Sequence, residues 1–425
     1  MYNLFDRVFQ TFANVMWGPP LLILLVGGGL YFTFYSRFIP FKYLFHGLNI
    51  LLGKHDNPND PGQISHFQAL SSALSSTVGM GNVSGVAVAI HLGGPGAIFW
   101  MWLSAIIGMA TKFFTCTLAI MYRDYDDNGE IQGGPMYVIQ KGMGAKYKFL
   151  AIIFSFAGLF GCLPMYQSNQ LTQLLRDQFF IPNNILNHNI SLLNLLIGVV
   201  ISLFVSSIIF GGIKSIGTFA SRIVPIMVFL YLVLGSIILV QNFELIDDAF
   251  LIIFKDAFSG KAVSGGIFAS VFIIGIKRAA FSNEAGIGTE AMAHGAAKTK
   301  EPIREGLVAM VGPLIDTIVV CTFTGLIIIV SGVWLGSESN GITLTAHAFE
   351  QNFPVYGNYM LFVIVLSFSL TTMIGYSYYG SKCAGYLFGA KSKLFYRYCY
   401  IFSIIIGSIF SIDLILNFLD GMFAM

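Results

Sequence analysis

The chain has 425 residues, of which 56% are hydrophobic and only 10% are charged, and its formal net charge is +2. Soluble globular proteins carry about 25% charged residues, so this composition excludes a soluble enzyme, a disordered protein and a secreted disulfide scaffold. The small net charge excludes a strongly basic surface for nucleic acid. A mean hydropathy of +0.75 instead predicts an all-α fold, a polytopic bundle of transmembrane helices.

Ten apolar stretches are each long enough to cross a bilayer as a helix, which takes about 20 residues. A tail at 411–425 is too short for another span, and we expect 134–142 and 245–258 to lie at the membrane surface. The predicted spans are 17–36, 65–92, 96–122, 147–175, 191–210, 216–240, 263–283, 303–332, 357–386 and 395–416.

The distribution of lysine and arginine predicts how these spans are oriented. If the N-terminus lies outside, all but four of the 23 basic residues fall on the cytoplasmic side. Basic residues concentrate in cytoplasmic loops, so we expect a multi-pass protein with its N-terminus outside. The four external basic residues would be Arg7, Arg176, Lys255 and Lys261.

The second span is interrupted by the run S-S-T-V-G-M-G-N at 75–82, which places glycine and polar residues at bilayer depth. A kink or a tight helix crossing would be the simple explanation. We favour an unwound segment, which is tolerated at that depth only where it lines a cavity or is buried in protein. Unwinding would free backbone amides, which suit a carboxylate, and carbonyls, which suit a small cation.

A second cluster begins in the seventh span, with Gly265, Gly266 and Gly275, and continues as F-S-N-E-A-G-I-G-T at 281–289. Breaks five spans apart lie in helices that run in opposite directions, the pattern of an inverted repeat with its site at the repeat interface. We therefore expect a five-plus-five repeat, 65–240 and 263–425, with the helix at 17–36 outside it. The whole chain, 1–425, would form one transmembrane domain.

Five motifs resemble the alanine/glycine:cation symporter family, also called the sodium:alanine symporter family, and they occur in the family order along nearly the whole chain. The resemblance implies a leucine-transporter-like fold and sodium-coupled import of small neutral amino acids, alanine and glycine, by alternating access. The implied protein is a transporter rather than an enzyme, with Na⁺ as coupling ion and no organic cofactor. The motifs are A-L-S-S-T-V-G-M-G-N-V-S-G-V-A-V-A-I-H-L-G-G-P-G-A-I-F-W-M-W (73–102), G-G-P-M-Y (133–137), F-S-N-E-A-G-I-G-T (281–289), D-T-I-V-V-C-T-F-T (316–324) and G-Y-S-Y-Y-G (375–380).

The resemblance also implies where the substrate binds. Amides near Met80 and Gly81 would hold its carboxylate, and Gly275 would leave room for a small side chain. Gln167 would line the pocket, although an interhelical hydrogen bond explains a glutamine there equally well. The full implied set is Thr77, Gly79, Met80, Gly81, Asn82, Gln167, Gly275 and Tyr376, in which Thr77 and Asn82 would serve the substrate amine or a second cation.

A sodium site is implied by carbonyls of Ser75 and Val78 together with the hydroxyls of Thr371 and Thr372. Oxygen ligands suit a hard cation such as sodium. The alternative for the two threonines is a hydrogen bond from each hydroxyl back to its own helix. By the same resemblance, we expect a monomer in a bacterial inner membrane.

The chain departs from the family pattern in four places. Tyr376 stands where tryptophan is expected, and Ser381 stands where glutamate is expected. Thr115 also replaces a glutamate and leaves Lys112 without its helical partner. Finally, the chain stops at D-G-M-F-A-M, before the family's eleventh span, so the last helix is expected to be truncated and to leave neighbouring apolar faces bare.

Charged residues inside a membrane mark functional sites by default. Asp316 is either a proton or cation relay or a structural residue that pairs with Lys112 or Arg278, and we favour the structural role. Glu284 and Glu290 are interpreted as an inner gate that pairs with neighbouring bases. Those bases would be Lys277, Arg278, Lys298 and Lys300.

Other functions are open to such a chain. A transport-inactive relic or substrate sensor of the same fold is the first alternative, and a proton-coupled amino-acid transporter is the second. A channel is disfavoured by the internal repeat, and an intramembrane enzyme by the lack of H-E-x-x-H and G-x-S-x-G motifs. No titratable group is evident beside Thr371, which favours sodium over protons.

Overall fold

A computed structural model describes residues 2–126, 128–186, 189–258, 267–336 and 341–425, so Gly265 and Gly266 lie outside the described residues. The described chain is helical apart from its loops and one two-stranded hairpin. In the hairpin, β1 (Asp124–Tyr125) pairs antiparallel with β2 (Ile131–Gln132).

Among the described residues, eight helical segments are long and apolar enough to cross a membrane, and they correspond to eight of the ten predicted spans. The other two predicted spans, 263–283 and 395–416, overlap the helices α15 (Ile267–Asn283) and α22 (Ser392–Ile409), and the second of them extends past the end of α22. The eight segments are Arg7–Tyr35 (α1, Tyr2–Met16, and α2, Pro19–Tyr35), His66–Gly93 (α5, His66–Thr77, and α6, Met80–Gly93), Ala97–Met121 (α7), Ala145–Phe180 (α9, Lys148–Gly161, and α10, Met165–Leu175), Ile190–Ile209 (α11), Gly212–Gln241 (α12), Pro302–Ser331 (α17, Pro302–Ala309, and α19, Thr322–Ser331) and Gly357–Phe388 (α21).

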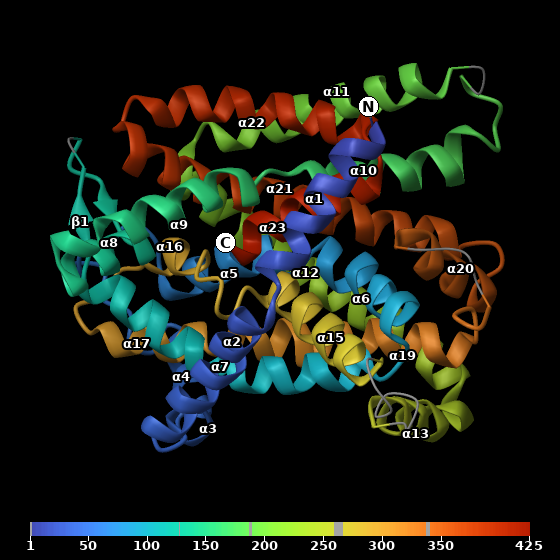
Figure 1. Ribbon diagram of the computed structural model, residues 1–425, viewed down its shortest axis with the longest axis horizontal. Coiled ribbons are helices and arrows are strands. Elements are labelled where there is room, and N and C mark those ends of the chain that lie inside the picture. Colours follow the sequence, from blue (N-terminus) through green and yellow to red (C-terminus); the bar gives the residue numbers. More distant parts are fainter. Residues whose placement is uncertain (1, 127, 187–188, 259–266, 337–340) are drawn as a thin grey trace.

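Shorter elements lie at the two ends of the bundle. The predicted surface segment 134–142 contains α8 (Pro135–Tyr137) and a π-helical turn (Val138–Met143), and the segment 245–258 contains α13 (Ile246–Ala257). Figure 1 shows β1, α8 and α17 at one end, and α13 and α20 at the other. The remaining short helices are α3 (Ile39–Lys42), α4 (Leu44–Leu51), α16 (Ala291–His294), α18 (Val311–Pro313) and α20 (Ile342–Asn352), and a π-helical stretch (Leu314–Cys321) precedes α19.

The interrupted pair α5 and α6 forms the centre of the molecule. The most apolar 18-residue window of this span is 100% buried, against 17% for the span near the N-terminus. α5 packs against α12 and α21, and α6 packs against α15, α19 and α20. Because other helices shield it, this span can contain irregular backbone without exposing it to lipid.

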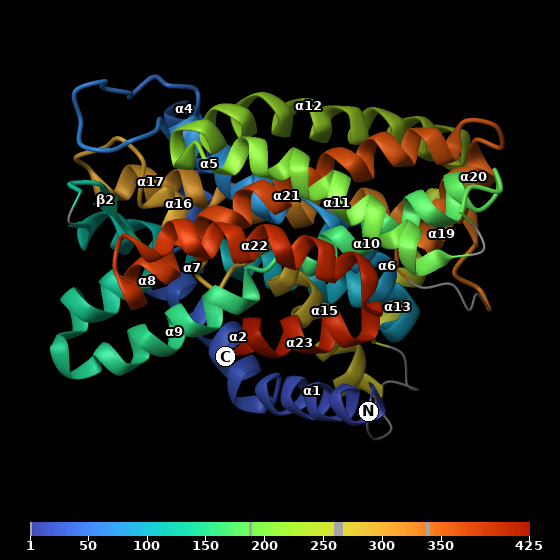
Figure 2. The same cartoon turned by 90° about the horizontal axis from the view of Figure 1, so that it is seen from above.

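The two ends of the chain pack against each other, which the sequence did not predict. The tail at 411–425 forms the helix α23 (Ile412–Ala424), and α1 runs alongside it (Figure 2). The rings of Phe9 and Phe418 lie 5.3 Å apart, and Phe12 lies directly over Gly421. The N-terminal helix α1 therefore covers one side of the tail helix α23.

Candidate functional site

The predicted interruption of the second span is present, between α5 and α6. Val78 and Gly79 are extended, with φ of −73° and −161°. Asn82 stabilises the restart of the helix, because its Oδ1 accepts the Gly79 amide at 2.8 Å. Met80 and Gly81 begin α6, where helix geometry gives the backbone amides no intrahelical acceptor. The same geometry leaves the last carbonyls of α5, including that of Ser75, without an intrahelical donor.

A second interruption follows α15. The helix ends at Asn283, and the chain is irregular until α16 begins at Ala291. Glu284, Gly286 and Gly288 have positive φ of 57°, 94° and 86°, the left-handed region that glycine adopts without strain. The glycines of the F-S-N-E-A-G-I-G-T motif therefore have a local structural role.

The two interruptions lie against each other. A Cβ built on Gly81 would lie 3.4 Å from Cα of Ser282 and 3.6 Å from the ring of Phe281. Phe281 continues the contact as an aromatic wall, since its ring lies 5.6 Å from that of Tyr166 and 5.2 Å from that of Phe423. The two interruptions thus meet in the fold, although the second lies after the seventh predicted span, because α15 runs unbroken through Gly275 to Asn283.

Asp316 joins both interruptions to the eighth predicted span. Its carboxylate is fully buried and accepts hydrogen bonds from Asn82 at 2.8 Å, and from Ser282 and Thr317 at 2.7 Å each. The predicted structural role fits these contacts, but the predicted partners are wrong. Among the described residues, no carboxylate lies within ion-pair distance of Lys112, and Arg278 pairs with another acid, described below.

The α21 residues predicted to bind sodium have different surroundings. Thr372 lies directly against Gly79, and its buried hydroxyl has no hydrogen-bond partner among the described residues. Thr371 donates instead to the carbonyls of Phe368 and Ser367, at 3.0 and 2.9 Å, and lies 3.4 Å from the sulfur of Met227 in α12. Thr371 therefore shows the alternative arrangement, a hydroxyl bonded to its own helix.

The other predicted substrate residues are not all brought together. Thr77 Oγ1 and Gln167 Oε1 are buried without a partner among the described residues. Tyr376 lies beside the Glu284 carboxylate, and its ring is 6.1 Å from that of Phe423. Gly275 packs elsewhere: a Cβ there would lie 2.6 Å from Cβ of Trp100 and 2.7 Å from the Ala97 carbonyl oxygen. Its contacts thus fit close packing on α7.

The charged residues near α15 contradict the predicted inner gate. Lys277 and Arg278 both pair with Asp420 of α23, at 2.6 and 2.5 Å. Glu284 and Glu290 are fully buried, and their side-chain donors are hydroxyls. Thr289 donates to Glu284 at 2.8 Å and Thr115 to Glu290 at 3.3 Å. Sequence reasoning missed Asp420 because it took the tail only as too short to form another span.

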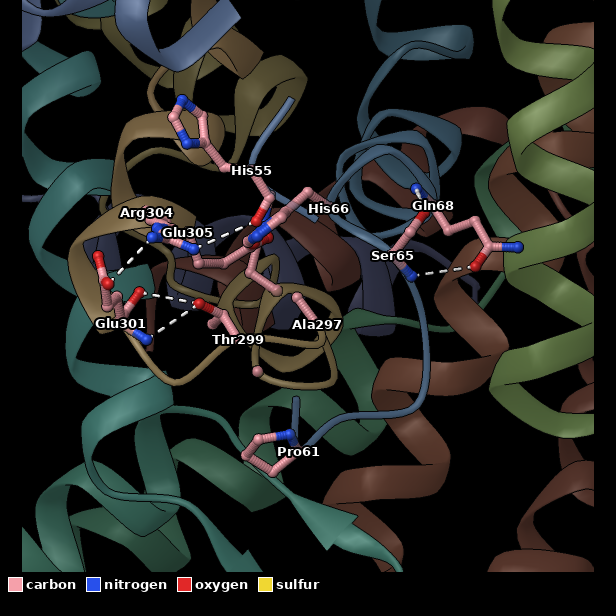
Figure 3. Close-up of polar contacts among 12 residues, drawn as sticks. His55, Pro61, Ser65, His66, Gln68, Ala297, Thr299, Glu301, Arg304 and Glu305 are labelled. Atoms are coloured by element: carbon pink, nitrogen blue, oxygen red, sulfur yellow. Dashed lines mark hydrogen bonds and ion pairs between the residues drawn. The ribbon is translucent and has the colours of Figure 1, made fainter. Parts of the chain in front are cut away.

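A further contact, also missed, closes one end of the bundle. Residues 61–64, which lead into α5, pair through their backbone with 296–299, which follow α16. Gln63 donates to Ala296 at 2.8 Å, and Lys298 donates to Ile64 at 2.8 Å. Figure 3 shows this region, including the capping box in which Ser65 and Gln68 begin α5.

Comparison with known proteins identifies the family. The model of the sodium:alanine symporter family matches residues 1–425. The chain belongs to this family. It is 40% identical over 424 residues to the sodium/alanine symporter AgcS of Methanococcus maripaludis, covering 98% of this chain and 91% of that protein. It is 32% identical to the probable sodium/glutamine symporter GlnT of Bacillus subtilis, covering 99% of this chain and 86% of that protein.

A solved structure supports the fold. The crystal structure of MhsT in complex with L-phenylalanine aligns with a TM-score of 0.57 at 15% identity, covering 82% of this chain and 80% of that one. The chain therefore has the leucine-transporter-like fold. Family membership makes it a multi-pass membrane transporter, not an enzyme, of a sodium-coupled symporter family. The inverted repeat and the roles of individual residues stay predictions.

Proposed function

We propose that this protein imports a small neutral amino acid, such as alanine or glycine, together with sodium by alternating access. It would act as a monomer in a bacterial inner membrane, with its N-terminus outside. One observation carries the proposal: the buried, unpartnered hydroxyl of Thr372 lies against the interrupted backbone at Gly79. A buried polar group without a partner is costly, so this geometry favours a bound cation at that position.

The sodium ligands would be the Thr372 hydroxyl and the carbonyls of Ser75 and Val78. These carbonyls belong to the last turn of α5 and to the residue that follows it, where intrahelical donors run out. All three residues are buried, so oxygen ligands there would replace water around the ion. Thr371 is a weaker candidate because its hydroxyl is already bonded to its own helix.

The substrate would lie between the two interruptions. Amides of Met80 and Gly81 would hold its carboxylate at the start of α6, where the helix dipole also favours negative charge. Thr77 and Gln167 would offer their unpartnered oxygens to the substrate ammonium. The side chain of Asn82 already hydrogen-bonds to the Gly79 amide and to Asp316. It would therefore hold the interrupted backbone in place and would not contact the substrate.

Aromatic side chains would set the size of the substrate. Phe281, Tyr376 and Phe423 form a chain of rings with centroid separations of 5.2 and 6.1 Å beside the second interruption. Packed aromatic walls exclude larger side chains because inserting extra methylene groups into a filled site forces neighbours to move. This arrangement favours alanine or glycine over leucine.

Coupling would arise because both ligands order the same backbone. Sodium at Val78 fixes the carbonyls that precede the amides used by the substrate, so binding one improves binding of the other, and the effect is reciprocal. Proton coupling is the competing mechanism, and Asp316 would be its candidate proton carrier, since it accepts a hydrogen bond from Asn82 of the interrupted helix.

The test is uptake of labelled alanine by purified protein in liposomes. An inward sodium gradient should drive accumulation, while an equal potassium gradient should not. Accumulation in potassium driven by a pH gradient would favour the proton mechanism instead. Sodium-dependent alanine binding without uptake would identify a transport-inactive sensor, and neither binding nor uptake in folded protein would refute the substrate assignment.

A further inference from the structure

A buried acid with two histidines lies beside the backbone contact that closes one end of the bundle. Glu305 of α17 accepts a hydrogen bond from Nδ1 of His294 at 2.5 Å and also contacts Nδ1 of His66. His66 opens α5, and His294 ends α16, so the cluster joins the segments that border the two interruptions. The three side chains are at most 1% exposed, and Figure 3 shows Glu305 and His66 side by side.

The ring nitrogens point to a proton as the ligand. Each Nδ1 contacts its own oxygen of the carboxylate, so the two nitrogens do not converge on one point where a metal ion could bind. Among the described residues, no group of three or more His, Cys, Asp or Glu side chains could hold a metal ion. Two neutral imidazoles around one carboxylate carry a net negative charge. One bound proton removes that charge, and a buried cluster that is neutral and hydrogen-bonded is far less costly than a charged one.

The surrounding charges do not neutralise Glu305 by themselves. Asp56 and Arg304 act on His66, and Glu290 acts on His294. Arg123 acts on Glu305 from the end of α7. Lys112 acts in turn on Glu290. The groups that contact Glu305 directly are the two imidazoles, which balance its charge only when they share one added proton.

The backbone segments 61–64 and 296–299 next to this cluster are closely packed. Gly62 lies against Ala297 and Lys298 so closely that any side chain there would collide with their backbone. Arg123 donates from its Nε to the Gly295 carbonyl at 2.8 Å and from Nη1 to that of Pro61 at 3.1 Å. Separation of the two segments must therefore pull His66 away from Glu305 and admit water.

We propose that His66, His294 and Glu305 form a proton-binding site that holds this end of the transporter closed while it is protonated. In the orientation of the proposed function this end faces the cytoplasm, so the site would make release of substrate and sodium sensitive to internal pH. A proton held between packed side chains is lost when the cluster opens to water. By linkage, closure is therefore favoured as pH falls, and opening is favoured as pH rises.

The experiment measures amide hydrogen exchange in the purified full-length protein, without substrate, at about pH 6 and about pH 8, either side of the ordinary histidine titration. After correction for intrinsic exchange rates, protection of the amides of 63, 64, 298 and 299 should fall about fivefold or more at the higher pH, the lower end for coupled sites. Glu305→Gln and His294→Asn should each abolish this pH response.

Two further variants control the measurement. His91→Asn changes an exposed histidine of α6 and should keep the wild-type response. Gly62→Ala should lower protection at both pH values, because the added methyl group collides with the backbone of Ala297 and Lys298 and forces the segments apart whatever the protonation of the cluster. A wild-type pH response in Glu305→Gln would overturn the proposal. If Glu305→Gln does not fold, then an unchanged response in His294→Asn would do the same.

Uptake gives a second readout that depends on the proposed function. Alanine uptake into liposomes at fixed external pH should fall when the internal pH is lowered, and Glu305→Gln should remove that dependence. If alanine is not transported but the exchange response is present, the proton site stands and only the substrate assignment fails. If uptake occurs without any exchange response, the proton site fails and the symporter assignment stands.

Discussion

Thr371 and Thr372 are adjacent threonines whose side chains have different contacts. Successive residues of a helix point about 100° apart, so only one of the two can face the interruption at Gly79. The family resemblance implied both as sodium ligands, since the residue type alone does not reveal which side chain faces the neighbouring helix. Their packing distinguishes them, because Thr371 contacts Met227 and Thr372 contacts Gly79.

Replacing these threonines singly should separate their roles. We expect Thr372→Ala to raise the sodium concentration for half-maximal alanine uptake at least tenfold, since about 1.4 kcal/mol of lost ligand energy gives that factor. Thr371→Ala should change it less than threefold. The measurement is sodium-dependent uptake in liposomes, and equal effects of the two variants would contradict the assigned sodium ligands.

Two replacements of Asp316 separate the loss of its negative charge from the loss of its hydrogen-bond acceptors. Asp316→Ala leaves the buried donors of Asn82, Ser282 and Thr317 without their acceptor, at about 1–3 kcal/mol for each unsatisfied group. Asp316→Asn keeps an acceptor oxygen and should lower thermal stability less. Thermal unfolding with and without alanine measures both effects. Equal stability of the two variants would argue against the hydrogen-bonding role.

At the scale of elements, the interruptions were predictable and the terminal helix was not. The S-S-T-V-G-M-G-N run and the glycines after Asn283 are poor helix formers, so their local chemistry indicates where the helix stops. Helix α23 has 13 residues, too few to be read as a span, and its partner α1 lies at the other end of the chain. No local pattern predicts such a pairing.

The ion pairs of α23 lead to a prediction about this helix. Asp420 is the acid for both Lys277 and Arg278, and its side chain is 4% exposed. Asp420→Ala would leave two largely buried cations unpaired, and breaking a buried pair costs about 3–5 kcal/mol. We expect a large drop in the midpoint of thermal unfolding. Asp413→Ala, at an exposed position of the same helix, is the matched control and should change little.

At the scale of the whole molecule, α1 packs on the outer side of α23, and α23 packs against the central site. Phe423 of α23 reaches Phe281 and Tyr376, while α1 covers the opposite side of that helix through Phe9 and Phe12. This packing was not predicted from the sequence, since the first predicted span begins at residue 17 and leaves α1 (Tyr2–Met16) without an assigned element.

Removing the side chains of Phe9 and Phe12 should reveal whether the packing of α1 on α23 is needed for transport. Phe9→Ala with Phe12→Ala would loosen α23, and we expect lower alanine uptake together with a lower unfolding temperature. Val8→Ala, at a position 52% exposed, controls for changes in α1 that do not touch α23. Unchanged uptake in the double variant would show that the site holds its shape without this contact.

The pairing of residues 61–64 with 296–299 affects what scanning mutagenesis can detect in this protein. Its hydrogen bonds run between main-chain atoms, so most side-chain replacements along it leave the bonds in place. Apart from Gly62, where a Cβ would meet the backbone of Ala297 and Lys298, an alanine scan would pass over the segment. A proline scan would not, because proline at position 298 removes the one N–H that binds the Ile64 carbonyl.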